Sequence, residues 1–151
     1  MAEGAFERGL EALSRKERTC AELVAWLAER GFDRDEIAEA VVRLTQARAL
    51  DDKRFAREFA TDKRSLRGWG PERIREALAS RGLDPGLIEG ALTLEGHGEQ
   101  LERAIGLLER RGEAPADECS RARALGYLAR RGFETEVAYE AVRGLERRLA
   151  A

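Results

Sequence analysis

The sequence predicts an all-α protein built as an elongated tandem array of three three-helix repeats. A pattern of Leu, two variable residues, Arg, Gly, a hydrophobic residue and an acid occurs three times, and its glycines, Gly31, Gly82 and Gly132, lie 51 and 50 residues apart. Spacings of this size are typical of repeat proteins, in which small helical units stack on their neighbours. A content of 37% charged residues with only three prolines also favours helices with a large exposed surface.

The first predicted repeat covers residues 1–50. Hydrophobic residues spaced by three and four predict an opening helix near Ala5–Ser14. Thr19 and Glu22 have the residue types and the spacing of a capping box, which predicts a second helix that continues to Arg30. The glycine of the repeated pattern suits the left-handed residue that ends a helix, and the acid two residues later suits the cap of a third helix.

The second predicted repeat covers residues 51–95. A long helix is expected from Asp51 to about Leu66, followed by a break at Gly68–Gly70. Pro71 fits the first turn of a second helix, because the amide hydrogen that proline lacks would be unpaired there. The residues to which we assign a structural role are Asp51, Asp52, Phe55, Gly68, Trp69, Gly70, Pro71 and Ile74.

The third predicted repeat covers residues 96–151. It begins at Gly96–Gly98, which we interpret as a hinge or linker, and His97 within it is expected to be a solvated loop residue without a neighbouring metal ligand. Hydrophobic periodicity then predicts an opening helix, and a closing helix after the third copy of the pattern. Cys20 and Cys119 lack the partners that a disulfide framework or a zinc site needs, so we expect both to pack as small hydrophobic residues.

Charge is distributed unevenly along the chain. Residues 53–81 contain nine Lys or Arg against four Asp or Glu, whereas the rest of the chain contains 18 against 25. At about 100° per residue, the long helix of the second repeat has a hydrophobic face and an opposite basic stripe. The predicted buried face carries Phe55, Phe59 and Leu66. The predicted stripe carries Lys53, Arg57, Arg64 and Arg67. The stripe is either a binding surface or an ordinary solvated face of an arginine-rich chain.

The overall charge limits what this stripe can bind. A net charge of −2 argues against tight, sequence-blind affinity of the whole molecule for nucleic acid, because such affinity depends on many phosphate contacts. A basic region flanked by acidic regions suits a partner that presents both signs of charge, such as a nucleoprotein surface.

Three segments between residues 50 and 83 resemble the RecX regulatory proteins. They are Leu50–Ala56, with its paired aspartates, and Arg67–Arg75, with its Gly-Trp-Gly-Pro run, followed by Leu78–Leu83. The first repeat is similar to that family at Ala21–Leu23 and at Arg30–Phe32. The resemblance extends over essentially the whole chain and is weakest between Leu94 and Ser120.

The resemblance implies a function without chemistry of its own. RecX proteins bind the recombinase RecA and lie along the groove of the RecA–DNA filament, which inhibits strand exchange, ATP hydrolysis and co-protease activity. It therefore implies a monomeric regulator of DNA repair with RecA as partner, weak or filament-mediated contact with DNA, and no cofactor. The basic positions of the family motif are filled here by Lys53, Arg54, Arg57, Arg67, Arg73 and Arg75, and Lys63 and Arg64 extend the same region.

The remaining motif residues have structural explanations. Trp69 either stacks on a partner or covers the break between two helices, and packing is the preferred interpretation. Gly68 and Gly70 are expected to serve the backbone conformation. Asp51 and Asp52 resemble the paired acids of an enzyme, but aspartates at a helix start are ordinary caps, so metal binding and catalysis are disfavoured.

Two alternative functions stay open, and two classes of protein, enzymes and membrane proteins, are disfavoured. The helix Pro71–Arg81 has several arginines, so a helix-turn-helix-like DNA-binding module is one alternative, and a repeat scaffold for an unrelated protein is the other. An enzyme is disfavoured, because the sequence has no phosphate-binding loop, dinucleotide fingerprint or clustered metal ligands. Because no run of about 18 apolar residues and no secretory signal occur, we expect a cytoplasmic protein without membrane contact.

Overall fold

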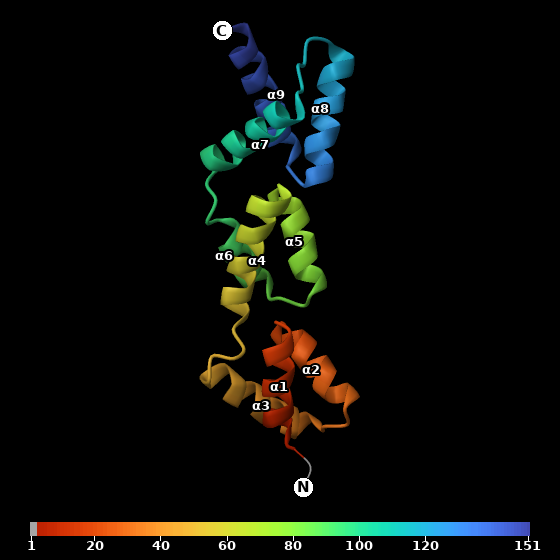
Figure 1. The fold of residues 1–151 in the computed structure, drawn as a ribbon, viewed down its shortest axis with the longest axis vertical. Helices are drawn as coiled ribbons and strands as arrows, with labels where there is room; N and C mark the ends of the chain where they lie inside the picture. The colour runs from red at the N-terminus through yellow and green to blue at the C-terminus, as the bar shows by residue number, and fades with distance from the viewer. Residues whose placement is uncertain (1–2) are drawn as a thin grey trace. The chain divides into compact units, whose positions relative to one another are not determined.

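The computed structural model describes residues 3–151, and within that range all regular secondary structure is helical (Figure 1). The helices are α1 (Ala5–Arg15), α2 (Cys20–Glu29), α3 (Arg34–Gln46), α4 (Asp52–Arg67), α5 (Pro71–Ser80), α6 (Pro85–Leu92), α7 (His97–Arg111), α8 (Glu118–Arg131) and α9 (Thr135–Ala150). The all-α helical array is therefore confirmed, and the expected helices occur in the expected order.

The repeated sequence pattern is the end of one helix and the start of the next. Gly31, Gly82 and Gly132 all have positive φ, of 89°, 78° and 99°, and lie one or two residues after the last residues of α2, α5 and α8. In each copy the amide of the hydrophobic residue that follows donates to the carbonyl of the leucine five residues earlier, for example Phe133 to Leu128 at 3.0 Å. This is the hydrogen bonding of a Schellman motif, in which a left-handed residue satisfies the last carbonyls of a helix.

The acid that closes the pattern begins the following helix in the first two copies. Asp33 accepts the amide of Glu36 at 2.8 Å, in a reciprocal capping box at the start of α3. Asp84 accepts the amide of Gly86 at 2.9 Å, in the first turn of α6. In the third copy Glu134 occupies the cap position of α9, and its side chain makes no capping hydrogen bond within residues 3–151. A short pattern thus ends one helix and places the next with local hydrogen bonds only.

The chain forms two compact units. The first contains the residues up to Phe59 together with Leu78–Ala91, and the second contains Ala60–Ala77 together with Leu92–Ala151. The boundary runs through α4 and α5, so the second predicted repeat contributes to both units. The division into repeats at residues 50 and 95 stays a prediction.

Each unit has its own hydrophobic core. In the first, α1, α2 and α3 surround Leu23, Leu27 and Leu44, whose side chains are fully buried. In the second, α7, α8 and α9 surround a core that includes Leu108 and Leu128. Full burial of one such side chain stabilises the fold by about 1.5–3 kcal/mol, so each core is a substantial part of the stability of its unit.

Two local predictions were wrong. His97 is not a loop residue but the first residue of α7, and its Nε2 lies 3.2 Å from a carboxylate oxygen of Glu140 on α9. Cys119 is exposed, so it does not pack as a core residue, whereas Cys20 is half-buried. Burial raises the pKa of the Cys20 thiol.

Candidate functional site

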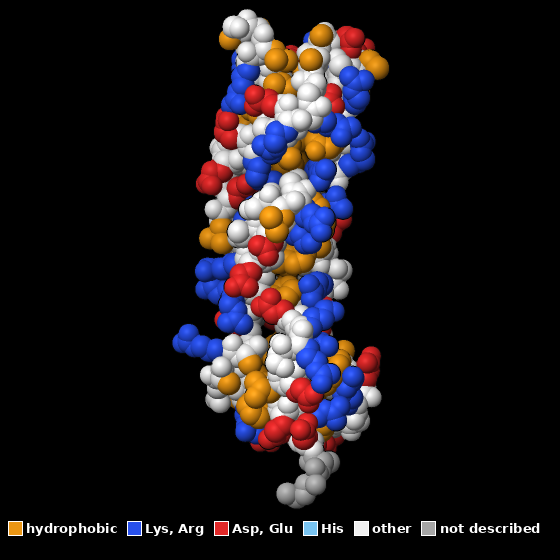
Figure 2. All heavy atoms as spheres, in the orientation of Figure 1, with side chains coloured by type: hydrophobic (Ala, Val, Ile, Leu, Met, Phe, Trp, Pro, Cys, Tyr) orange, Lys and Arg blue, Asp and Glu red, His pale blue; other side chains and the backbone are white. Residues whose placement is uncertain are grey.

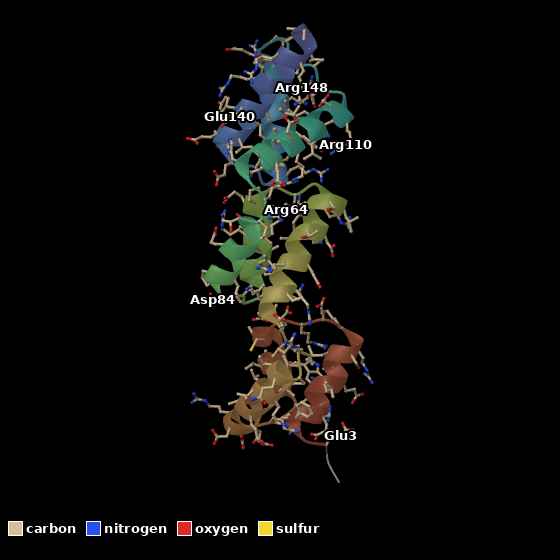
Figure 3. All side chains as sticks on the ribbon, turned by 90° about the vertical axis from the view of Figure 1, so that its left-hand side faces the viewer. Glu3, Arg64, Asp84, Arg110, Glu140 and Arg148 are labelled. Atoms are coloured by element: carbon tan, nitrogen blue, oxygen red, sulfur yellow. The ribbon has the colours of Figure 1, made fainter. Side chains whose placement is uncertain are left out.

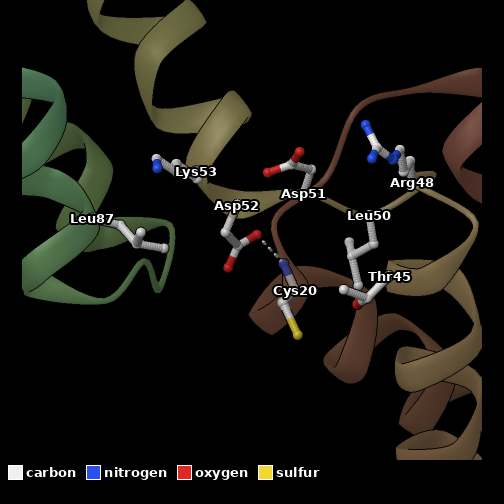
Figure 4. Close-up of a pocket in the computed structure, with 8 residues that line it drawn as sticks. All are labelled: Cys20, Thr45, Arg48, Leu50, Asp51, Asp52, Lys53 and Leu87. Carbon is white, nitrogen blue, oxygen red and sulfur yellow. Dashed lines mark hydrogen bonds between the residues drawn. The ribbon is translucent and has the colours of Figure 1, made fainter.

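The paired aspartates at the start of α4 bind the starts of two different helices. Asp51 Oδ1 accepts the amide of Arg54 at 3.0 Å and so caps α4. Asp52 Oδ1 accepts the amide of Cys20 at 2.8 Å, at the first residue of α2 (Figure 4). Carboxylates are favoured at helix N-termini because the unpaired amides there carry partial positive charge. Both side chains therefore have a structural task.

These aspartates also line a hollow of about 440 Å³ in the first unit. Its lining contains Cys20, Thr45, Leu50 and Leu87 as well as Asp51, Asp52, Arg48 and Lys53 (Figure 4). Acidic and basic side chains are equally represented, so the hollow has no strong preference for one sign of charge. Across residues 3–151, no group of three or more His, Cys, Asp or Glu side chains is placed to hold a metal ion.

Three of the predicted partner-binding residues are exposed on the first turns of α4. They are Lys53, Arg54 and Arg57. Two others, Arg67 and Arg73, are exposed at the end of α4 and on α5. On the face that Figure 2 shows, Lys and Arg side chains alternate with Asp and Glu side chains and do not form one continuous patch. The surface therefore offers both signs of charge to a partner.

The predicted exposure of Arg64 is wrong. Its side chain is only 12% exposed, its Nε lies 3.6 Å from a Glu95 carboxylate oxygen, and its Nη2 donates to the Leu92 carbonyl at 3.2 Å. Arg64 follows Ala56 and Ala60, both fully buried, at intervals of four residues, so it continues the buried face of α4. Burial lowers the pKa of the Arg64 guanidinium, and the Glu95 carboxylate opposes that shift.

The predicted burial of Leu66 is also wrong. Its side chain is 78% exposed, whereas Phe55 on the same predicted face is buried. The buried face of α4 is centred on the small Ala56 and Ala60 rather than on the phenylalanines. The basic stripe is therefore reduced to Lys53, Arg57 and Arg67.

The Gly-Trp-Gly-Pro segment joins the start of α5 to the end of α8. The Gly70 amide donates to the Arg131 carbonyl at 2.6 Å, and the Glu72 amide donates to the Gly132 carbonyl at 2.9 Å. A Cβ atom at Gly70 would lie 2.5 Å from the backbone carbonyl carbon and oxygen of Gly132. The unpaired amides of one helix thus satisfy the unpaired carbonyls of another, and only glycine permits this approach.

A second contact between helix ends, made by side chains, joins the start of α2 to the end of α5. The Thr19 hydroxyl donates to the Arg81 carbonyl at 2.8 Å, and the Arg81 guanidinium donates to both Glu22 oxygens at 3.0 and 2.9 Å. The same guanidinium lies 4.5 Å from the centre of the Phe55 ring. The Arg81 hydrogen bond lowers the pKa of Glu22.

Sequence reasoning missed these two helix-to-helix contacts. The available signal was the recurrence of an Arg-Gly pair in every copy of the pattern, because a surface arginine needed only for a partner would not have to recur. The pairs Arg81–Gly82 and Arg131–Gly132 both lie at such a contact.

Comparison with known proteins identifies the family. A model described as RecX, first three-helix domain, matches residues 5–44, and a model described as RecX, second three-helix domain, matches residues 51–92. A regulatory protein RecX from Stenotrophomonas maltophilia (strain K279a) is 38% identical over 139 residues, which cover 91% of this chain and 84% of that protein. The chain belongs to the RecX family.

Further RecX relatives agree in sequence and in fold. A regulatory protein RecX from Chromobacterium violaceum is 35% identical over 141 residues, covering 91% of this chain and 88% of that protein. The crystal structure of RecX from Lactobacillus salivarius has a TM-score of 0.86 at 23% identity and covers 94% of each chain. A second crystal structure, of a regulatory protein RecX, has a TM-score of 0.76 at 26% identity and covers 93% of this chain and 70% of the other. The sequence resemblance is confirmed.

In this RecX chain, the other motif residues on α5 and just before it mainly make internal contacts. Trp69 is half-buried, and its ring centre lies 4.8 Å from Lys63 Nζ and 4.3 Å from Arg73 Cζ, within the range of cation–π attraction. Arg75 bonds to Glu72 one turn earlier on the same helix. Ile74 is fully buried. Of the two predicted binding residues on α5, Arg73 is exposed although its guanidinium lies over the Trp69 ring, and Arg75 is half-buried.

None of the helices in residues 3–151 is both long enough and apolar enough to cross a membrane.

Proposed function

We propose that this chain binds RecA and RecA–DNA filaments in the bacterial cytoplasm and inhibits their recombinase, ATPase and co-protease activities by occupying the filament groove. The observation that carries the proposal is membership of the RecX family, with similarity to proteins named regulatory protein RecX over 91% of the chain. The chain would supply no chemistry and would act by changing which filament states are populated.

The exposed basic side chains at the start of α4 support this proposal. Lys53, Arg54 and Arg57 lie on consecutive turns of one helix, and all three are exposed. They are surrounded by a surface of mixed charge, which suits a nucleoprotein partner with both signs of charge. Because charge complementarity mainly speeds encounter and sets register, we expect binding to weaken as salt increases.

The first experiment is cosedimentation of the purified protein with preformed RecA–single-strand filaments, with RecA-free DNA as the control. The proposal expects the protein in the pellet with filaments and inhibition of RecA ATP hydrolysis. Absence of the protein from the filament pellet at low salt would contradict it.

A paired variant tests the assigned residues. In Arg54→Glu/Arg57→Glu, two exposed charges are reversed, and we expect filament binding to weaken roughly tenfold. Arg54 is the third residue of α4 and its amide already bonds to Asp51, so a glutamate there completes a capping box and should not destabilise the helix. The matched control is Arg34→Glu/Arg147→Glu, which makes the same charge change at exposed positions on α3 and α9.

The helix-turn-helix alternative is less well supported by the contacts of α5. A recognition helix needs free basic side chains, but Arg75 bonds to Glu72 and Arg81 bonds to Glu22. Tight, sequence-selective binding of a labelled duplex without RecA would favour that alternative. Recovery of a protein other than RecA as the main partner would favour the scaffold.

A further inference from the structure

A hollow of about 410 Å³ in the second unit is lined by five arginines. They come from the end of α4, from α7 and from the end of α8, and they are Arg64, Arg67, Arg103, Arg110 and Arg131. Figure 3 labels two of them, Arg64 and Arg110. Among the described residues that line it, none is Asp or Glu. By contrast, the arginine-rich hollow beside Trp26 in the first unit is also lined by Glu3 and Glu11.

Three of these arginines are held in place by the fold. Arg103 donates to both oxygens of Glu95 at 2.6 and 3.0 Å, and Arg64 approaches the same carboxylate. Arg131 Nη1 donates to the Arg67 carbonyl at 2.6 Å. The side chains of Arg64 and Arg103 are only 12% and 17% exposed. Because they are fixed before any ligand arrives, their donors need little further ordering to bind one.

The other two arginines are available to a ligand. Arg67 and Arg110 are exposed, and within residues 3–151 neither side chain donates a hydrogen bond to another residue. Within residues 3–151, Glu95 pairs with Arg64 and Arg103, and the Glu99 carboxylate also attracts the Arg64 guanidinium, so positive charge exceeds negative charge around this hollow. An anion placed among them would relieve the repulsion between like charges.

We propose that this hollow binds phosphate groups in the backbone of a nucleic acid strand. Arginine presents a planar fork of donors that matches phosphate oxygens, and several forks around one hollow can hold neighbouring phosphates of a strand. A strand fits better than a small phosphate, because the hollow is open and exposed ion pairs are weak singly and effective together. The exposed Leu66 also lines the hollow and offers an apolar contact to a base.

This inference deepens the proposed function and rests on it for the choice of nucleic acid as the source of the phosphates. It assigns the DNA contact to the hollow in the second unit. The basic residues Lys53, Arg54 and Arg57, which belong to the first unit, are not part of this assignment. The two assignments can therefore fail separately.

The test is binding of a fluorescein-labelled single-stranded oligothymidine to the full chain without RecA, measured by anisotropy over a series of salt concentrations. The parent should bind at low salt. For Arg67→Glu/Arg110→Glu we expect roughly tenfold weaker binding, and the slope of log K against log salt should fall by about 0.7 for each lost phosphate contact. Arg34→Glu/Arg147→Glu is the control with the same charge change, and it should retain most of the affinity and the parent slope.

A second variant guards against effects on folding. Arg67→Gln/Arg110→Gln removes the charges without placing acids near the end of α4, and it should show the same loss in weaker form. Circular dichroism of all variants should match the parent.

The outcomes separate the possible ligands. Equal affinity of the Arg67 and Arg110 variants and the control would overturn the inference, and so would failure of the parent to bind at low salt. If inorganic pyrophosphate displaces the oligothymidine, the hollow is a phosphate site as proposed. If the chain binds pyrophosphate but not oligothymidine, the assignment to a nucleic acid strand is overturned. If the parent inhibits RecA but the hollow variants bind oligothymidine normally, only this inference fails. If the hollow binds oligothymidine but the parent does not bind filaments, only the proposed function fails.

Discussion

Replacing Gly70 with alanine should disrupt the contact between the start of α5 and the end of α8. The added Cβ would lie 2.5 Å from the carbonyl carbon and oxygen of Gly132 and 2.6 Å from the Phe133 amide nitrogen. All three are backbone atoms, so no side-chain rotation can relieve the overlap, and the two helix ends have to separate. Separation breaks the bonds from Gly70 to Arg131 and from Glu72 to Gly132.

The expected cost follows from those two hydrogen bonds. Each contributes about 0.5–1.5 kcal/mol net, and a buried carbonyl left without a donor costs roughly 1 kcal/mol or more. We therefore expect the Gly70→Ala variant to lower the opening free energy of this contact by about 3 kcal/mol. At about 1.4 kcal/mol for each factor of ten, this corresponds to roughly 100-fold faster amide exchange in peptides that cover residues 68–75 and 128–135.

Hydrogen exchange followed by mass spectrometry measures the effect locally, which matters because the two units need not unfold together. The control is Gly98→Ala in the first turn of α7, where a Cβ would meet no other part of the described chain within 4 Å. It should leave exchange in the same peptides unchanged. If Gly70→Ala changes the opening free energy by less than about 0.5 kcal/mol, the steric reasoning is refuted.

Two further predictions concern the ion pairs. Because Arg81 lowers the pKa of Glu22 in the folded chain, the stability from this pair is complete above the unfolded pKa of about 4.3 and is lost as pH falls through the lower folded pKa. Acid titration of the parent and of Glu22→Gln, followed by circular dichroism, should show a smaller loss of stability in the variant. Identical profiles would contradict the pairing. Glu95→Gln leaves the largely buried Arg64 and Arg103 without the carboxylate that they share, and should destabilise the second unit by about 3 kcal/mol. Urea denaturation of this variant and of Glu136→Gln, an exposed control on α9, measures the effect. Equal midpoints for the two variants would show that Glu95 is dispensable.

Apart from the start of α7, the helices and their ends were predictable because local hydrogen bonds determine them. Thr19 and Glu22 form the expected capping box, and Pro71 begins α5 as expected. Both depend on residues within one turn of each other in the sequence, and such contacts require no knowledge of the tertiary packing.

The environment of α4 was not predictable in the same way. A helical wheel gives the direction in which Arg64 leaves the helix axis. It does not give the position of Glu95, which lies 31 residues later and forms a largely buried ion pair with Arg64. The wheel also gave too little weight to alanine, since Ala56 and Ala60 mark the centre of the buried face. The arginine hollow could not be predicted from the sequence, because its arginines lie on three helices and no short motif connects them.

Comparison of the three copies of the repeated pattern shows whether its glycine is needed for the positive φ or for close contact with a neighbouring helix. Gly132 has Arg73 within 2.4 Å of its ideal Cβ position, and Gly82 has Ala21 within 2.6 Å, so close contact alone could explain glycine at both positions. At Gly31, however, no atom of residues 3–151 outside the glycine and its two chain neighbours lies within 4 Å of the ideal Cβ position, yet φ is 89°. The left-handed helix end is therefore the shared requirement, and the contacts between helix ends use a backbone shape that the Schellman motif already provides.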